Sequence, residues 1–242
     1  MSALAANLEE LEAEIAAACR RAGRARSEVE LMAVSKTFPA STVTEAAALG
    51  LALFGENRVQ EFAAKATELE PLRVKADRPV RVHLIGHLQS NKAARAVELF
   101  DGIDSVDSLR LAERIDDAAG RRGKKLPILI EVKMSAEESK AGLLPESNEA
   151  AELLERLPDL AHLELRGLMT IAPLGVPEAQ TRACFRALGE WRNRWAGEHP
   201  RLSFSVLSMG MSGDFPLAIE EGATRIRIGS SLFGRRPSAE KQ

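Results

Sequence analysis

The sequence contains no tyrosine, and its 242 residues include only two cysteines, Cys19 and Cys184. The missing tyrosine excludes any mechanism that depends on a tyrosine acid or base. Two distant cysteines cannot form the disulfide framework of a small secreted protein, and they favour a reducing compartment. The longest stretch without a charged residue, Leu202–Gly213, has twelve residues, well short of the roughly 18 needed to span a bilayer. We therefore expect neither a disulfide scaffold nor a membrane protein.

The sequence also has little excess of either charge. Its 33 Lys and Arg residues face 35 Asp and Glu residues, for a net charge of -2. This balance gives no reason to expect nucleic acid or an anionic membrane as a partner. The apolar fraction of 45% and the charged fraction of 28% are typical of a soluble globular protein. The N-terminal residues lack the basic start of a signal peptide, so we expect a cytoplasmic protein.

Short apolar segments alternate with segments of helical periodicity along the chain. A first helix is indicated by one apolar face made of Leu4, Leu8, Leu11, Ile15 and Cys19. The predicted strands are Val29–Val34, Leu51–Phe54, Val80–Ile85, Gly102–Val106, Pro127–Val132, Leu163–Ile171, Ser203–Leu207 and Thr224–Ile228. Further helices are predicted over roughly 40–49, 57–69, 90–99, 108–122, 145–156, 177–196 and 213–221. Asp107 is placed to cap the helix that begins at 108.

Eight consecutive β-α units in a chain of this length predict an α/β fold: a single (β/α)8 TIM barrel that occupies residues 1–242. An open doubly wound sheet has the same periodicity and is the alternative. In a barrel, functional residues follow the C-terminal ends of the strands. The residues just after each predicted strand are therefore the candidates for a site.

Lys36 follows the first predicted strand, in the run Ala33-Val34-Ser35-Lys36. Partial burial there would disfavour the charged form of the amine and make it a nucleophile for an aldehyde. A solvated loop lysine is the alternative. Glu56 and Asn57 follow the second strand, where they could cap the next helix. Asn57 could instead present its amide to the ring oxygen of a ligand.

Two histidines, His83 and His87, lie four residues apart near the end of the third strand. This spacing suits a metal pair on a helix, but Gly86 interrupts any helix there, and no glutamate follows His83 as a metalloprotease helix requires. We therefore expect no metal site. His83 is predicted to pack within the strand, and His87 to lie in the loop.

Glycine and serine combine in the loops after the seventh and eighth strands. These loops contain Ser208–Gly213 and Gly229–Gly234. In α/β barrels, the loops after strands seven and eight are the usual phosphate site, where backbone N–H groups and hydroxyls bind the anion. Plain turn chemistry is the alternative. A phosphate site together with a nucleophilic Lys36 would suit a phosphorylated aldehyde, of which pyridoxal 5'-phosphate (PLP) is the obvious one.

Seven stretches, in order along nearly the whole chain, carry a resemblance to a known family. They are Ala33–Lys36, Phe54–Arg58, His83–Lys92, Ser139–Gly142, Gly167–Pro173, Leu207–Asp214 and Arg227–Gly234. With these motifs the sequence resembles the pyridoxal phosphate homeostasis proteins, also known as the proline synthetase co-transcribed homologue family. The resemblance implies a barrel like the N-terminal domain of alanine racemase.

The resemblance also implies roles for individual residues. Lys36 would carry PLP as a Schiff base, and Asn57 would line the pocket. The phosphate would be bound by Ser208, Gly229 and Ser230, with Met209 near the cofactor. Arg227 would face the pyridine nitrogen. One departure concerns Lys133, which stands where the family usually has asparagine, so we assign it no ligand role.

An arginine that faces the pyridine nitrogen of PLP would change the chemistry of the ring. Arg227 stays cationic and would disfavour protonation of the pyridine nitrogen, which makes the ring a poorer electron sink. We therefore expect a protein that holds PLP reversibly in vitamin B6 homeostasis, with no catalytic residue and no turnover. Its partners would be PLP and PLP-dependent apoenzymes, and we expect a monomer.

Two other functions are possible from the sequence. The first is a PLP-dependent racemase or lyase. In alanine racemase the second acid–base group is a tyrosine from a separate β-domain, and this chain has neither tyrosine nor residues beyond a short tail after the eighth strand. The second is a barrel that binds another phosphorylated ligand, such as a flavin or a sugar phosphate, without a Schiff base.

Overall fold

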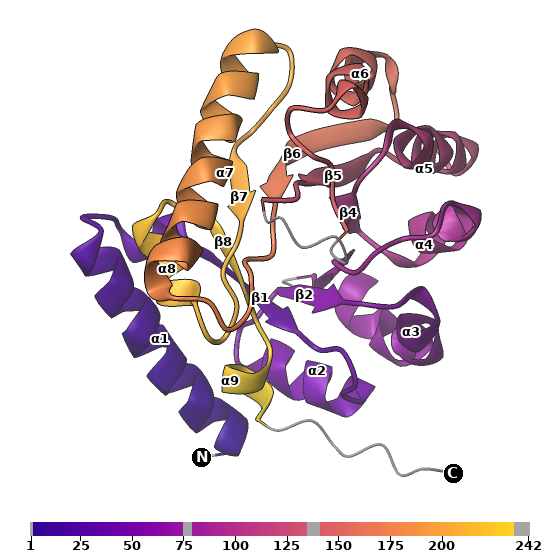
Figure 1. Cartoon of the computed structure of the whole chain (residues 1–242). Helices are drawn as coiled ribbons and strands as arrows, with labels where there is room; N and C mark the ends of the chain where they lie inside the picture. Colours follow the sequence, from indigo (N-terminus) through magenta and orange to yellow (C-terminus); the bar gives the residue numbers. More distant parts are fainter. Residues whose placement is uncertain (1, 75–78, 135–140, 235–242) are drawn as a thin grey trace.

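The strands form a closed parallel barrel. The computed structural model describes residues 2–74, 79–134 and 141–234. The strands join in sequence order, and β1 pairs with both β2 and β8 (Figure 1). They are β1 (Glu30–Val34), β2 (Leu53–Glu56), β3 (Arg81–Leu84), β4 (Gly102–Val106), β5 (Leu126–Glu131), β6 (Leu163–Met169), β7 (Val206–Ser208) and β8 (Arg225–Ile228). The predicted barrel is confirmed, and the open-sheet alternative was wrong.

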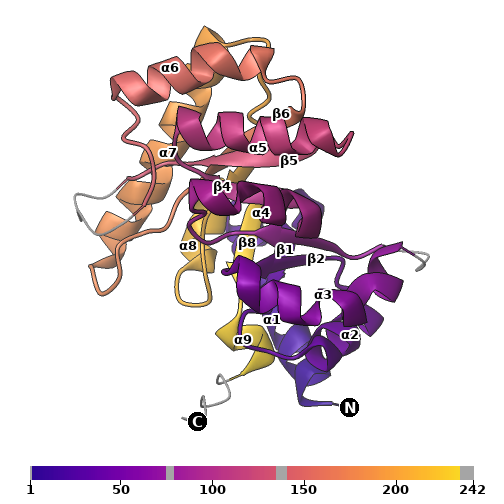
Figure 2. The same cartoon turned by 90° about the vertical axis from the view of Figure 1, so that its right-hand side faces the viewer.

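Helices surround the barrel in the order of the chain (Figure 2). They are α1 (Ala3–Arg21), α2 (Ala40–Ala48), α3 (Val59–Val74), α4 (Ala93–Leu99), α5 (Leu109–Arg121), α6 (Asn148–Arg156), α7 (Glu178–Glu198), α8 (Phe215–Glu220) and α9 (Ser230–Phe233). Short 3-10 turns occupy Arg26–Glu28, Ser90–Lys92 and Leu157–Asp159. Among the described residues, none of these helices is both long and apolar enough to cross a membrane.

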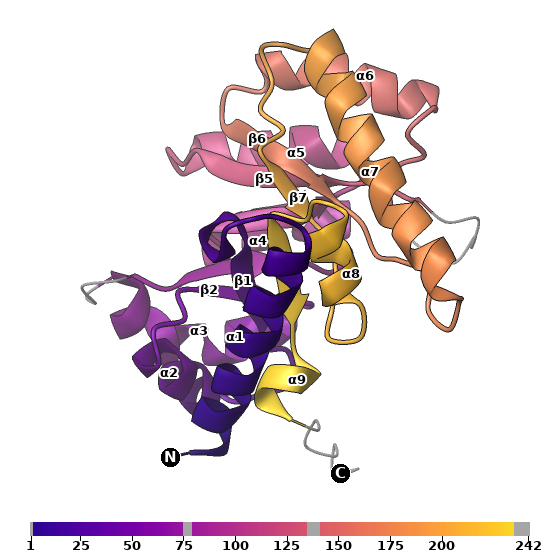
Figure 3. The same ribbon diagram turned by 90° about the vertical axis from the view of Figure 1, so that its left-hand side faces the viewer.

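The first helix completes the outer layer where the last helices are short. Helix α1 precedes β1 and packs against α8 and α9 (Figure 3). Ser2 caps α1, since its Oγ accepts a hydrogen bond from the Ala5 amide at 3.2 Å. Leu11, Ile15 and Cys19 are buried on its inner face, as their spacing predicted.

One glycine allows β6 and β7 to approach each other closely. Gly167 has a φ of 151°, a conformation that favours glycine. A Cβ built there would lie only 1.9 Å from the carbonyl oxygen of Val206. Gly167 therefore lets these two strands pair and sets the positions of the residues that follow them at the barrel mouth.

Six of the seven further helices begin one to three residues after their predicted starts, and serine caps explain two of these differences. Ser108, not Asp107, caps α5: its backbone is extended, and its Oγ accepts a hydrogen bond from the Leu111 amide at 3.3 Å. The side chain of Asp107 instead contacts His87. Likewise, α6 begins only after Ser147, whose Oγ accepts from the Ala150 amide at 3.2 Å. In both cases a serine cap sets the helix start.

Candidate functional site

A cavity of about 540 Å³ lies at the C-terminal ends of the strands, where barrels of this kind carry their sites. Five of the predicted site residues line it: Lys36, Asn57, Arg227, Gly229 and Ser230. Ser208 and Met209 are fully buried, and the described residues that line the cavity do not include them. The barrel thus brings together residues from β1, β2 and β8 that are up to about 190 positions apart in the sequence.

Lys36 and Asn57 reach the cavity from neighbouring strands. Lys36 is half-buried on the turn after β1. The Ser35 amide beside it donates to the carbonyl oxygen of Gly55 at 3.0 Å. Asn57 follows β2 and is packed against the next loop, where a Cβ on Gly86 would lie 2.2 Å from the Asn57 carbonyl oxygen. The absence of a side chain at Gly86 therefore allows the backbone of Asn57 to pack closely against this loop at the cavity wall.

Arg227 is held rigidly at the wall. Its guanidinium group is buried, with Nη1 donating to the backbone oxygen of Ser208 at 2.7 Å and to Ser208 Oγ at 2.9 Å. Its Nη2 donates to the backbone oxygen of Thr170 at 2.8 Å. Burial lowers the pKa of Arg227, and the acidic groups Asp104, Glu131 and Asp214 oppose this. Arginine remains cationic under such conditions, so the cavity has a fixed positive charge on one side.

Ser208 therefore contacts Arg227 in this structure and does not face the cavity. The serine and glycine of the same loop that do line the cavity are Ser212 and Gly213. The loop is ordered by Asp214, whose Oδ1 accepts from the Met211 amide at 2.6 Å. Ser212 Oγ accepts from the Ser231 amide at 3.3 Å, which joins this loop to the loop after β8. Hydroxyls and amides from both loops can therefore contact one anion.

Glu131 is a site residue that the sequence reasoning missed. It is the last residue of β5, it lines the cavity, and it is 5% exposed. Burial and the charge of Asp107 raise its pKa to about 7, although Arg227 and His87 act in the opposite direction. Its Oε2 has no hydrogen-bond partner in the described part of the chain. The rule that functional residues end barrel strands could have identified it.

The two histidines play separate parts. His83 is buried in β3, and its Nδ1 lies 2.8 Å from Asp104 Oδ1. His87 lines the cavity with an exposed side chain, and its Nδ1 lies 3.0 Å from Asp107 Oδ2. The described ranges contain no group of three or more His, Cys, Asp or Glu side chains that could hold a metal ion. The locations predicted for both histidines are confirmed.

A family model, alanine racemase N-terminal domain, matches residues 6–237. The pyridoxal phosphate homeostasis protein of Pseudomonas aeruginosa is 42% identical, with 98% of this chain and 97% of the relative covered. That of Vibrio cholerae is 40% identical, with 98% of each chain covered. The chain belongs to the pyridoxal phosphate homeostasis protein family.

Solved structures agree with this family assignment. PipY of Synechococcus elongatus, solved with PLP bound, is 44% identical, covers 96% of this chain and 100% of its own, and has a TM-score of 0.80. The same protein solved without PLP gives a TM-score of 0.81 over the same coverage. Alanine racemase of Clostridium difficile has a TM-score of 0.74 at 15% identity, and 58% of its chain is covered. That likeness concerns the fold alone.

This family member also has a cationic residue across the cavity. Lys133, where the family resemblance leads us to expect asparagine, lines the cavity after β5, on the opposite side of an eight-stranded barrel from Lys36 after β1. The stretch 139–142, which carries part of the family resemblance, ends at Gly142. Gly142 has a φ of 117°, a backbone conformation that favours glycine. Ser139 and Lys140 of that stretch lie outside the described residues.

Proposed function

We propose that this chain binds PLP in the cavity and serves intracellular PLP homeostasis. The observation that carries the proposal is the meeting of Lys36, Arg227 and two Gly-Ser loops on one cavity wall, in a chain whose relative PipY was solved with PLP bound. When bound, PLP supplies an aldehyde that condenses with a primary amine, forming a C=N bond and releasing the carbonyl oxygen as water. Lys36 would supply that amine.

The described residues fit such a group. The cavity volume falls within the range of small-molecule sites. Glu131 Oε2 is a buried polar atom on the wall that has no partner in the described ranges, which is the condition in which a ligand donor would satisfy it. Gly229, Ser230 and Ser212 offer amides and hydroxyls to a phosphate group. The earlier assignment of Ser208 to the phosphate stays a prediction, and Ser212 is the serine that we favour.

Arg227 would make this a site for holding the cofactor. Three hydrogen bonds fix the guanidinium, so it cannot move away when the pyridine nitrogen approaches it. Its charge would keep that nitrogen unprotonated and the ring a weak electron sink. We therefore propose a carrier or buffer without turnover, from which an added amine releases PLP by exchange with Lys36.

The structure also supplies a reason to test for catalysis. A racemase needs a second acid–base group opposite its lysine, and the absence of tyrosine does not remove every candidate. Glu131 is the only carboxylate among the described residues lining the cavity, and its pKa is about 7, near the value that acid–base catalysis favours. Loss of deuterium from the α-carbon of labelled amino acids would reveal such chemistry. We expect none above the rate with free PLP.

Absorbance spectroscopy tests the binding proposal with a matched control. Wild type, Lys36→Ala and Lys133→Ala would each be mixed with PLP, and free lysine would then be added. We expect an imine band in wild type and Lys133→Ala, no band in Lys36→Ala, and loss of the band when lysine is added. A band that persists in Lys36→Ala but disappears in Lys133→Ala would contradict the proposed anchor. A band that added lysine cannot remove would contradict the carrier role.

A further inference from the structure

The turn that carries Lys36 has an unfavourable backbone conformation. Thr37, the next residue, has a φ of 68° and is the only non-glycine residue with positive φ in the described part of the chain. A β-branched residue rarely adopts this conformation, and it does so only where surrounding contacts impose it. The contacts that hold Thr37 therefore also set the direction in which Lys36 leaves the backbone.

A buried lysine of helix α3, Lys65, contacts the turn on both sides of Lys36 and Thr37. Lys65 is 7% exposed, and its Nζ donates to the backbone oxygens of Ser35 at 2.9 Å and Phe38 at 2.8 Å. Nζ also lies 2.7 Å from Glu56 Oε1. These contacts match the three protons of an ammonium group. The two carbonyls flank Lys36 and Thr37, so Lys65 joins the two sides of the turn.

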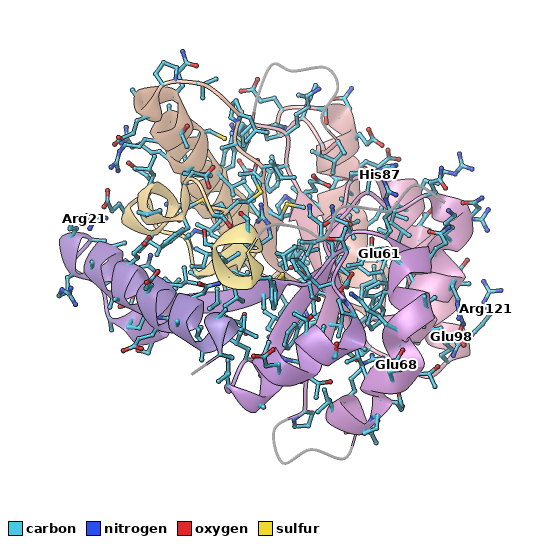
Figure 4. All side chains as sticks on the ribbon, turned by 90° about the horizontal axis from the view of Figure 1, so that it is seen from below. Arg21, Glu61, Glu68, His87, Glu98 and Arg121 are labelled. Atoms are coloured by element: carbon cyan, nitrogen blue, oxygen red, sulfur yellow. The ribbon has the colours of Figure 1, made fainter. Side chains whose placement is uncertain are left out.

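Two carboxylates complete the arrangement. Glu61 Oε1 accepts a hydrogen bond from the Thr37 amide, and Glu56 Oε1 accepts one from Ser35 Oγ at 2.6 Å. Glu61 and Lys65 are four residues apart on α3, so they share a face of the helix. Figure 4 shows Glu61 on the part of α3 nearer to His87, which lines the cavity, whereas Glu68 lies farther along the helix.

We propose that Lys65 and Glu61 are positioning residues that fix residues 35–38 so that the Lys36 amine is presented to the aldehyde of PLP. This inference rests on the proposed function. Neither side chain lines the cavity, so each acts through the turn. Misplacement of a reacting group by about 1 Å can reduce a rate by up to roughly 100-fold. Loss of either contact should therefore slow imine formation and leave the phosphate contacts after β7 and β8 intact.

The first test concerns Glu61, which is more exposed than Lys65. Glu61→Ala removes the acceptor on the Thr37 amide, Glu61→Gln keeps an acceptor oxygen, and Glu68→Ala is a control on the exposed surface of the same helix. In the protein without PLP, we expect hydrogen exchange at the Thr37 amide to be at least about 10-fold faster in Glu61→Ala than in wild type. Glu61→Gln and Glu68→Ala should resemble wild type. Unchanged exchange in Glu61→Ala would overturn the role of Glu61.

The second test separates presentation of the amine from the rest of the site. The rate of appearance of the imine band is measured with PLP, and the affinity is measured for pyridoxine 5'-phosphate, which has the ring and phosphate but no aldehyde. We expect Glu61→Ala to form the imine roughly 10-fold more slowly and to bind pyridoxine 5'-phosphate as wild type does. Equal losses with both ligands, or no loss with PLP, would overturn the inference.

A variant of the buried pair tests Lys65. Because Lys65→Met alone would leave Glu56 buried without its cation, it is combined with Glu56→Gln, which keeps an acceptor for Ser35. Like Glu61→Ala, the double variant should form the imine with PLP more slowly than wild type and should bind pyridoxine 5'-phosphate with unchanged affinity. If it fails to fold, its exchange and binding cannot be measured, and Glu61→Ala decides the inference. If wild type itself forms no imine band, the proposed function is wrong. If wild type forms the band and the variants form it equally fast, only the positioning role of Lys65 and Glu61 is wrong.

Discussion

Replacement of Glu131 by glutamine should stabilise the protein without PLP above neutral pH and have little effect in acid. The pKa of Glu131 is raised from 4.5 to about 7, so its ionised form is disfavoured in the folded state. Below pH 4.5 the carboxyl is protonated in both the folded and unfolded states, and no penalty exists. The penalty grows as the pH rises from 4.5 to about 7 and is constant above that.

The size of this effect follows from the pKa change. Each pKa unit corresponds to about 1.4 kcal/mol, so the penalty reaches about 3 kcal/mol above pH 7. Glutamine has the shape of the protonated side chain and no charge. The charges of Arg227, Asp107 and His87 also act on Glu131, and these three residues are present in both proteins. The difference between wild type and Glu131→Gln therefore isolates the contribution of this carboxyl.

Urea unfolding followed by circular dichroism, at a series of pH values between about 4.5 and 8.5, measures that difference. We expect Glu131→Gln to match wild type within about 0.5 kcal/mol at the acid end and to exceed it by about 3 kcal/mol at the alkaline end. A difference that stays constant over the whole range would refute the reasoning, because an unshifted carboxyl or a purely steric change gives no such slope.

Two further predictions concern single residues. Gly167→Ala should lower the free energy of unfolding by about 3 kcal/mol or prevent folding, because its Cβ would overlap the Val206 carbonyl. Gly189→Ala on α7, where nothing lies within 4 Å of the new Cβ, should instead stabilise by about 0.5–1 kcal/mol. Equal urea midpoints for the two variants would be evidence against the close β6–β7 approach. Ser212→Ala should weaken PLP binding by about tenfold, measured by equilibrium titration, because a hydrogen bond to a charged phosphate group is lost. If Ser208→Ala weakens binding and Ser212→Ala does not, Ser208 is the phosphate ligand, as the sequence predicted.

The architecture could be predicted from the sequence because each strand is a short apolar segment bounded by helical periodicity. Val29–Val34 and Gly102–Val106, for example, coincide with β1 and β4 to within one residue. The closure of the barrel then brings Lys36, Asn57, Arg227, Gly229 and Ser230 to one cavity. Position after a strand was enough to single out Lys36, Asn57, Gly229 and Ser230, whereas Arg227 lies within β8 and was predicted from the family resemblance.

The remaining parts of the site depend on tertiary contacts that no local pattern reports. Ser208 and Ser212 are separated by only Met-Gly-Met. Ser208 pairs with Arg225 of β8 and accepts hydrogen bonds from Arg227, whereas Ser212 lines the cavity. Lys65 has the sequence setting of an ordinary helical lysine, most of which are exposed. Its burial beneath the Lys36 turn arises from the packing of α3. The raised pKa of Glu131 likewise follows from burial at the mouth of the barrel.

The most direct test of the account is to identify the residue that bonds to PLP. Wild-type protein incubated with PLP would be reduced with borohydride, which fixes the C=N bond, then digested and examined by mass spectrometry. We predict a single reduced adduct on Lys36, with none on Lys133 in the same cavity and none when Lys36→Ala is treated in the same way. An adduct on another lysine, or no adduct with saturating PLP, would contradict the central claim that Lys36 holds the cofactor.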